Sequence, residues 1–125
     1  QVEANLLGVI SLPPQDEDLK DLTNTKHEVY VSYEKSSPTG AIFIEQKNSL
    51  VWIHKLVVDP NHFRKGIAKS LVSYALNLYP DFIFNVSTGD KNQPALNLYK
   101  KFHFELKSRS ELAEGLSVVT LERKP

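Results

Sequence analysis

Hydrophobic and polar residues alternate along the first half of the chain. Val29, Val31 and Tyr33 occupy every second position, with mostly polar residues between them. This period of two is typical of a strand with one buried face. Turn-forming residues such as Pro38 and Asn48 interrupt the pattern. The pattern predicts three consecutive antiparallel strands, at residues 28–34, 41–45 and 50–58.

After residue 60 the spacing of the hydrophobic residues becomes helical. Two helices are predicted from residues three or four apart, the first from Ile67, Leu71, Ala75 and Leu78 and the second from Ala95, Leu98, Tyr99 and Phe102. The first ends before Pro80, and Pro94 suits the first turn of the second, where its missing N–H leaves no partner unsatisfied. The apolar segment 82–87 predicts a strand, and a strand–helix–strand crossover makes it parallel to strand 50–58.

The two ends of the chain carry weaker patterns. Residues 102–106 and 116–121 predict two closing strands around a polar loop. Residues 2–10 predict a short helix. The acids at 16–18 predict a second short helix that ends near Leu22, because acidic side chains suit the positive end of a helix dipole.

Composition narrows the classes of protein that fit. A chain of 125 residues is long enough for one domain with a single core. It has no cysteine and its histidines lack metal-ligand spacing, so we expect no metal. Lys plus Arg and Asp plus Glu number 15 each, which weighs against a nucleic-acid partner. No apolar run approaches the roughly 20 residues that span a bilayer and no secretory signal precedes the fold, so we expect a cytoplasmic protein without a membrane partner.

Residues 57–69 carry the strongest functional signal. A strand ends at Pro60, a basic loop containing Arg64 and Lys65 follows, and Gly66 opens an amphipathic helix. The unpaired N–H groups of a helix's first turn attract anions, and a glycine lets an anion approach closely. The segment is therefore a candidate diphosphate cradle, with a plain solvated turn at Gly66 as the alternative.

The same segment resembles the signature of the GNAT superfamily of N-acetyltransferases. In that signature a strand ending in V-x-P precedes [QR]-x-x-G-x-[GA] at the start of a helix, and Gly66 and Ala68 match its end. The resemblance covers about residues 28–122. A second match, to N-x-x-A-x-x-L-Y-x-x-x-G-F, consists of Asn92, Ala95, Leu98, Tyr99 and Phe104.

The resemblance implies an α/β (α+β) fold for one domain over residues 1–125. The expected sheet is mixed and mostly antiparallel, with about six strands and a central parallel pair, flanked by about four helices. The sequence departs from the family at Phe63, where the family has Gln or Arg, and at His103, where it has Gly. The family's first strand is not found ahead of Val2.

The resemblance also implies an activity, the direct transfer of an acetyl group from acetyl-CoA to a primary amine. The acceptor is a small molecule or a peptide or protein, and a homodimer is an allowed assembly. Phe63 keeps a second reading open, a module that binds coenzyme A or acetyl-CoA and regulates a partner without turnover. The basic loop supports a third, an anion- or nucleic-acid-binding domain.

Two side chains are candidate catalytic groups. The family often places a general base on the strand that corresponds to 50–58, and His54 there carries an imidazole, which suits removal of the amine's proton. The alternatives are a strand histidine without chemistry and a water chain that leads to Glu45. Tyr99 stands where the family has a tyrosine that protonates the leaving thiolate, or else it is a core aromatic. Trp52 is assigned to the core.

The resemblance assigns the remaining site residues to acetyl-CoA. Asn92 is expected to bond the pantetheine arm, with a helix N-cap as the alternative. A free N–H near Leu56 is expected to stabilise the oxyanion. The cofactor-binding residues are therefore Leu56, Val57, Val58, Phe63, Arg64, Lys65, Gly66, Ile67, Ala68, Lys69, Asn92 and Tyr99.

Overall fold

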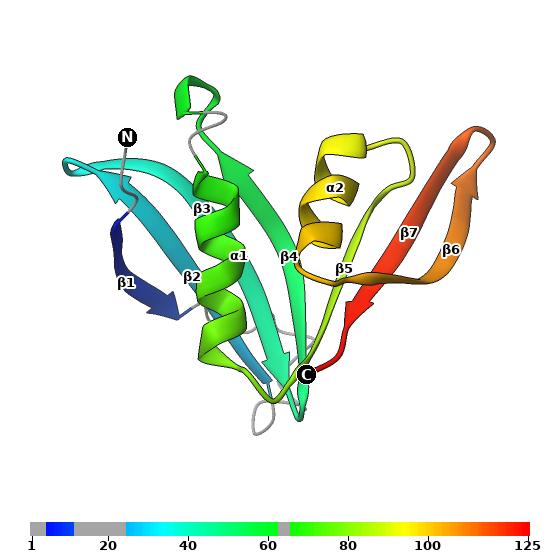
Figure 1. The fold of residues 1–125 in the computed structure, drawn as a ribbon, viewed down its shortest axis with the longest axis horizontal. Coiled ribbons are helices and arrows are strands. Elements are labelled where there is room, and N and C mark those ends of the chain that lie inside the picture. Colours follow the sequence, from blue (N-terminus) through cyan, green and yellow to red (C-terminus); the bar gives the residue numbers. More distant parts are fainter. Residues whose placement is uncertain (1–4, 12–24, 63–65) are drawn as a thin grey trace.

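A seven-stranded sheet organises the residues that the computed structural model describes, which are 5–11, 25–62 and 66–125 (Figure 1). The strands are β1 (Asn5–Ser11), β2 (Thr25–Glu34), β3 (Ser37–Lys47), β4 (Leu50–Val58), β5 (Ile83–Gly89), β6 (Glu105–Ala113) and β7 (Leu116–Arg123). The helices are α1 (Ile67–Leu78), α2 (Gln93–Lys101) and the 3-10 turn η2 (Pro60–His62). The strands lie in the order β1-β2-β3-β4-β5-β7-β6, and only β4 and β5 are parallel neighbours.

Most of the predicted order of elements is confirmed. The strands β2, β3 and β4 form the antiparallel meander, and α1 crosses from β4 to β5 as the parallel pair requires. The number of helices is corrected, because the described residues contain two α-helices and not about four. The helix predicted to end near Leu22 lies outside the described residues.

The helix predicted over residues 2–10 is wrong, because residues 5–11 form strand β1. Its backbone pairs antiparallel with β2, from Asn5 opposite Tyr33 to Ser11 opposite Glu28. The segment is short and contains Gly8, so its own helix propensity is small. Pairing with the edge of an existing sheet outweighs that propensity and adds a seventh strand to the six that the sequence predicts.

The polar loop predicted between the last two strands is also corrected. Residues 105–113 continue as strand β6, and a tight turn leads directly into β7. Every residue of β6 is exposed. β6 is an edge strand with no buried face, so its sequence lacks the alternation that identifies a strand.

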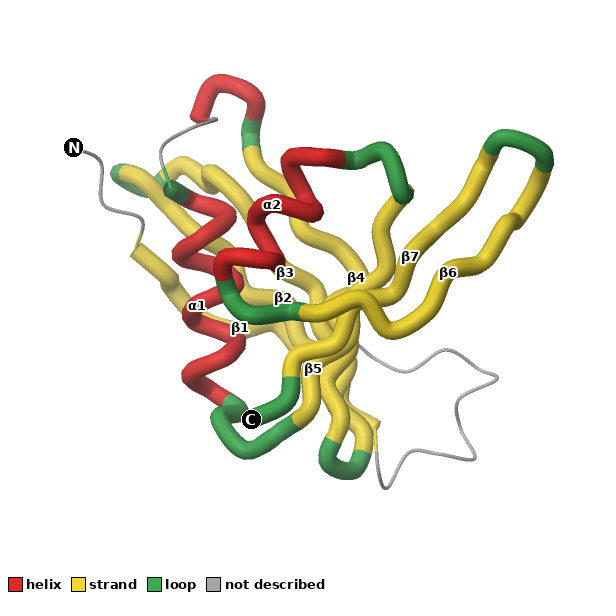
Figure 2. The backbone as a smooth tube through the Cα atoms, turned by 45° about the vertical axis from the view of Figure 1, so that its right-hand side comes forward, coloured by secondary structure: helices red, strands yellow, loops and turns green. Residues whose placement is uncertain are grey.

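Both α-helices pack on the same face of the sheet, which we call the helix face (Figures 1 and 2). One side of α1 is fully buried through Ile67, Leu71, Val72 and Ala75. These side chains meet the inward-facing residues of the central strands, which are Ile42, Ile44, Val51, Ile53, Phe84 and Val86. The opposite side of the sheet, which carries Glu45 and Trp52, is called the second face.

Gly40 on β3 fixes how closely α1 approaches the sheet. A Cβ at this position would lie 2.8 Å from the Val57 carbonyl oxygen and 2.9 Å from Cγ2 of Ile67. The first turn of α1 therefore lies directly against the backbone where β4 ends. This contact sets the N-terminus of α1 beside the end of β4.

The residue that replaces the family's glycine after α2 adopts a glycine-like backbone. His103 has φ 71° and its N–H donates to the Lys100 carbonyl at 3.0 Å. A left-handed residue commonly ends a helix, and glycine is favoured there because it has no Cβ. The sequence departs from the family in residue type, while the backbone keeps the conformation that glycine favours.

Candidate functional site

The parallel strands β4 and β5 separate partway along their length. Their pairing ends at Ile53 and Val86, although β4 continues to Val58 and β5 to Gly89. Beyond this level the edge of β4 that faces β5 has no partner on that strand. A gap therefore opens in the middle of the sheet.

A β-bulge in β4 lies at the same level. Ile44 of β3 pairs with Ile53 of β4. The preceding residue, Phe43, pairs with Lys55, which leaves His54 as an extra residue without a partner on β3. A bulge bends its strand and redirects side chains, which accounts for the departure of β4 from β5 at this point.

The gap between β4 and β5 is a cavity closed by α2. Leu56 and His54 line it from β4, and Asn92 and Tyr99 line it from the α2 side. Four predicted site residues thus come together here. The remaining lining residues are Ile53, Lys55, Val86, Ser87, Thr88, Ala95 and Leu98.

Tyr99 is almost completely buried beside this gap. Its side chain is 4% exposed, and its ring packs against Phe104 with 5.2 Å between the ring centroids. Burial raises the pKa of Tyr99 to about 12, because the phenolate is poorly solvated there. At neutral pH the hydroxyl therefore carries its proton, as a candidate general acid must.

Asn92 is a helix cap that also lies at the gap. Its Oδ1 accepts a hydrogen bond from the Ala95 N–H at 3.2 Å, so the residue is the N-cap of α2. The same side chain lines the gap. The cap uses the side-chain oxygen, and the side-chain NH₂ group remains able to donate.

A groove runs from the N-terminus of α1 to α2. Gly66 has φ 77°, which is left-handed, and no side chain of the described residues caps the helix. The first N–H groups of an α-helix are donors that suit an anion. The predicted residues that line the groove are Val58, Gly66, Ile67, Ala68 and Lys69. The predicted site residues Phe63, Arg64 and Lys65 lie outside the described residues.

The sequence missed the residues that α2 contributes to this groove. Asn97 and Lys101 line it from the side opposite Gly66 and Lys69, and His62 also lines it. Asn97 and Lys101 are four residues apart and so lie on one side of α2. That spacing could have identified them, but their types are ordinary on an exposed helix surface.

Val57 lies apart from the other predicted residues of β4. Its side chain is 46% exposed, and it lines neither the gap nor the groove. Leu56 lines the gap and Val58 lines the groove. The alternation of the strand explains why neighbouring residues differ in this way.

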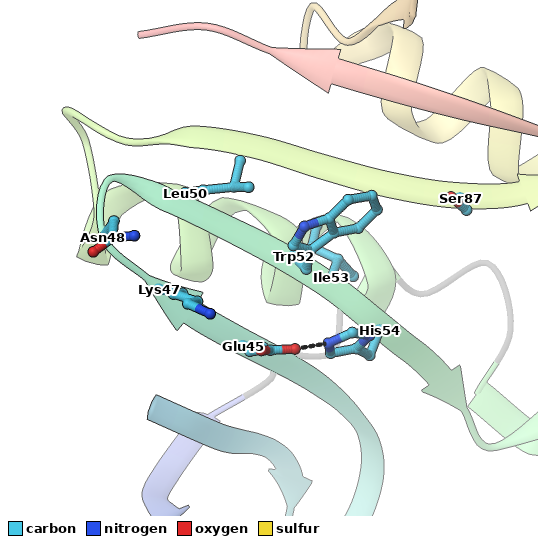
Figure 3. Close-up of a pocket in the computed structure, with 8 residues that line it drawn as sticks. All are labelled: Glu45, Lys47, Asn48, Leu50, Trp52, Ile53, His54 and Ser87. Atoms are coloured by element: carbon cyan, nitrogen blue, oxygen red, sulfur yellow. Dashed lines mark hydrogen bonds and ion pairs between the residues drawn. The ribbon is translucent and has the colours of Figure 1, made fainter. Parts of the chain in front are cut away.

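A depression of about 500 Å³ lies on the second face, with α1 behind the sheet (Figure 3). Leu50 and Trp52 form its apolar wall, and Glu45 and His54 lie at its other side. The assignment of Trp52 to the core is therefore wrong. Trp52 alternates with the buried residues Val51 and Ile53 and so points to the second face.

His54 is paired with a carboxylate that the sequence named only as an alternative. Its Nε2 lies 2.6 Å from Oε1 of Glu45, and Nε2 of His27 lies 3.8 Å from the same oxygen. The His54 side chain is 51% exposed, whereas Glu45 is 26% exposed. The alignment of β3 with β4 brings these residues together, and no short sequence pattern predicts that alignment.

The three hollows adjoin because they share lining residues. Ile53, His54 and Ser87 line both the gap and the depression on the second face. Ala95 and Leu98 line both the gap and the groove. The groove, gap and depression thus follow one another from the helix face to the second face of the sheet.

Two further properties concern the described residues as a whole. Neither of their α-helices has the length and apolar character needed to cross a membrane. They also contain no group of three His, Cys, Asp or Glu side chains suited to a metal ion.

Comparison with known proteins identifies the family. Residues 4–104 match the Acetyltransferase (GNAT) family, which is most of the chain. The chain therefore belongs to the GNAT acetyltransferase family, as its strand order and its two sequence motifs indicate.

The chain is similar to several individual proteins. It is 31% identical over 116 residues to the UPF0157 protein YqkA of Bacillus subtilis, a match that covers 91% of this chain and 34% of YqkA. The chain thus spans about a third of that relative, and a single domain over residues 1–125 stays a prediction. It is 40% identical over 57 residues to the peptidyl-lysine N-acetyltransferase YjaB of Salmonella typhimurium, covering 46% of this chain and 38% of YjaB.

A solved structure shares the fold. The Bacillus subtilis acetyltransferase in complex with CoA has a TM-score of 0.68 and 18% sequence identity, with 97% of this chain and 99% of that chain covered. At this identity the likeness concerns the fold alone.

Proposed function

We propose that this protein is an N-acetyltransferase that moves an acetyl group from acetyl-CoA directly to a primary amine. The observation that carries the proposal is the series of three adjoining hollows through the separation of β4 and β5. Such a series lets two reactants meet inside the sheet from opposite faces. The candidate base His54 and the candidate acid Tyr99 both line the gap at the centre of the series.

The groove suits the charged end of acetyl-CoA. The uncapped start of α1 supplies N–H donors, and Lys69 and Lys101 add positive charge from its two sides. The narrow gap suits the pantetheine arm, where the NH₂ group of Asn92 is available to donate. The coenzyme A that a Bacillus subtilis protein of the same fold binds supports this assignment.

Side chains at the gap can supply the proton transfers that the acetyl transfer requires. An alkylamine is mostly protonated at neutral pH, so it first loses a proton to His54. The amine nitrogen then bonds to the acetyl carbon, and the carbon–sulfur bond breaks. The buried hydroxyl of Tyr99 gives its proton to the leaving thiolate. The new amide nitrogen gives its second proton to water, and Tyr99 regains a proton from water. An N–H near Leu56 stabilises the charge that develops on the carbonyl oxygen, an effect worth roughly 2–4 kcal/mol when the donor is preorganised.

The depression on the second face suits an amine carried on an aliphatic chain. Leu50 and Trp52 offer apolar contact to the chain, and the Glu45 carboxylate attracts the terminal ammonium. A lysine side chain of a peptide or protein has this form. The Salmonella relative named as a peptidyl-lysine N-acetyltransferase supports this acceptor class. A cytoplasmic location and a homodimer stay predictions.

The test is release of the free thiol of coenzyme A from acetyl-CoA. The purified chain is given a lysine-containing peptide, the same peptide with acetylated lysines, and small alkylamines. We expect thiol release that depends on the free lysine, together with acetylated peptide in the mass spectrum. If the chain bound acetyl-CoA but released no thiol with any amine, it would be a binding module and not an enzyme.

A further inference from the structure

Glu45 on β3 lies between two imidazoles on the second face. Its Oε1 is 2.6 Å from Nε2 of His54 and 3.8 Å from Nε2 of His27. Figure 3 shows the His54 ring turned toward the Glu45 carboxylate across the surface of the sheet. Of the described residues that line this depression, Glu45 is the one acid.

The sheet register explains the cluster. His27 and Glu45 are direct cross-strand neighbours on β2 and β3, and Glu45 in turn lies opposite Trp52 on β4. His54 lies two residues beyond Trp52, at the bulge. The extra residue in β4 places an imidazole beside the gap while its ring still reaches the carboxylate on the neighbouring strand.

We propose that Glu45 is a positioning residue for His54, an inference that depends on the proposed function. A carboxylate that accepts the hydrogen bond from Nε2–H fixes the tautomer of the imidazole. The lone pair is then on Nδ1, where it can take the proton of the amine. The negative charge of Glu45 also stabilises the imidazolium that forms, as the carboxylate of a nucleophile–histidine–carboxylate triad does.

The surroundings of His54 leave Glu45 as its partner. Among the described residues that line the depression or the gap with His54, the charged or titratable ones are Glu45 and Lys47 on β3, Lys55 on β4 and Tyr99 on α2, and His27 on β2 lies near Glu45. The β5 side contributes the uncharged Ser87. His27 lies 3.8 Å from the same carboxylate oxygen, beyond hydrogen-bond distance, so we expect it to have a smaller effect.

The experiment compares Glu45→Gln, Glu45→Asp, His54→Ala and the Glu45→Gln/His54→Ala double variant. Acetyl-CoA-dependent thiol release is measured with a lysine peptide and with an alkoxyamine, whose nitrogen is already uncharged at neutral pH. Glu45→Gln keeps the shape of the side chain, so we expect kcat for the peptide to fall roughly 10- to 100-fold. We expect Glu45→Asp to restore part of this loss and the alkoxyamine rate to change much less.

The double variant tests whether Glu45 acts through His54. If it does, the double variant is no slower than His54→Ala alone, because the two losses are not independent. The proposal would be overturned if the kcat losses of the two single variants multiplied in the double variant. It would also be overturned if Glu45→Gln lowered kcat equally for the lysine peptide and the alkoxyamine. A Glu45→Gln enzyme as fast as the unchanged protein would overturn it too.

Two controls separate this inference from the proposed function. Glu111→Gln removes an exposed carboxylate on β6, away from the three hollows, and we expect the kcat of the unchanged protein. A thermal shift with acetyl-CoA checks that each variant folds and binds the donor. Failure of the unchanged protein to release thiol with any amine would overturn the proposed function itself, whereas active unchanged protein with an insensitive Glu45 overturns only the positioning role.

Discussion

Ile53 and Val86 form the last residue pair between β4 and β5, and the gap begins at that pair. The bulge at His54 follows immediately on one strand, and Ser87 and Thr88 follow on the other. The bulge at His54 therefore lies between the paired, packed part of β4 and β5 and the gap between their ends.

Gly66→Glu is expected to abolish donor binding. The new side chain adds bulk and negative charge where the N–H groups of α1 are free to bind a diphosphate. At a concentration 100 times Kd, acetyl-CoA stabilises the unchanged protein by about 2.7 kcal/mol, and we expect no shift in the variant. Gly115→Glu is the matched control, because Gly115 also has φ 77° and open space around it. A full ligand shift in Gly66→Glu would remove the cradle from the site.

Tyr99→Phe is expected to slow turnover while leaving the fold intact. The ring keeps its packing against Phe104, but the proton for the leaving thiolate is lost. We expect kcat to fall roughly 100-fold with little change in the Kd of acetyl-CoA. Steady-state kinetics and a binding titration check both quantities. An unaltered kcat would make Tyr99 a core residue only.

Stability is expected to fall between about pH 10 and pH 12. The pKa of Tyr99 is about 12 in the folded protein and near 10 when unfolded, so the unfolded state loses its proton first. The stabilisation is complete below the unfolded value and is lost as pH rises through the folded value. Burial and hydrogen bonding to Glu28 raise the pKa of Tyr30 and Tyr79 in the same direction. Urea unfolding at a series of pH values should show that the free energy of unfolding falls less steeply with pH in Tyr99→Phe than in the unchanged protein.

Gly40→Ala is expected to destabilise the fold by about 1–3 kcal/mol. The added methyl group would overlap the Val57 carbonyl oxygen and the Ile67 side chain, and overpacking of this kind forces backbone shifts. Gly89→Ala is the control, since its Cβ meets nothing within 4 Å. Denaturant unfolding of the two variants measures the difference. Equal stabilities would mean that α1 does not lie as close to β3 as this contact requires.

His103→Gly is expected to raise stability by up to about 1 kcal/mol. His103 has φ 71°, a left-handed conformation that costs a residue with a Cβ about 1–2 kcal/mol. Glycine removes that cost. Part of the gain is offset because glycine gives the unfolded chain more conformational entropy to lose on folding. Thermal unfolding measures the change. A lower melting temperature would show that the imidazole contributes contacts worth more than the strain.

The central part of the fold could be predicted from the sequence because local patterns there agree with tertiary structure. The switch from strand to helix period after Pro60 implies the crossover, and Gly66 marks the uncapped helix start. β1 was predicted as a helix and β6 was given the wrong bounds, for a shared reason. Both lie at sheet edges, where pairing with a neighbour decides the structure and residue alternation is weak.

Site residues that lie within one sequence segment could be predicted. Site residues that meet only through the alignment of neighbouring strands could not. Asn92 caps α2 and Tyr99 lies within it, so one sequence motif contains both, and both line the gap. The pairing of His54 with Glu45 requires the bulge and the alignment of two strands, which leave no local pattern. Lys101 lines the groove because the fold places α2 across from the start of α1, which the sequence does not specify.

The arrangement of hollows on opposite faces has a kinetic consequence. If acetyl-CoA enters by the groove and the amine by the depression, as proposed, the two substrates reach the centre of the sheet by separate routes and neither blocks the path of the other. Coenzyme A should therefore compete with acetyl-CoA and not with the amine in product-inhibition experiments. A bulky protein acceptor could also arrive and depart repeatedly while the nucleotide end of the donor stays seated beside α1.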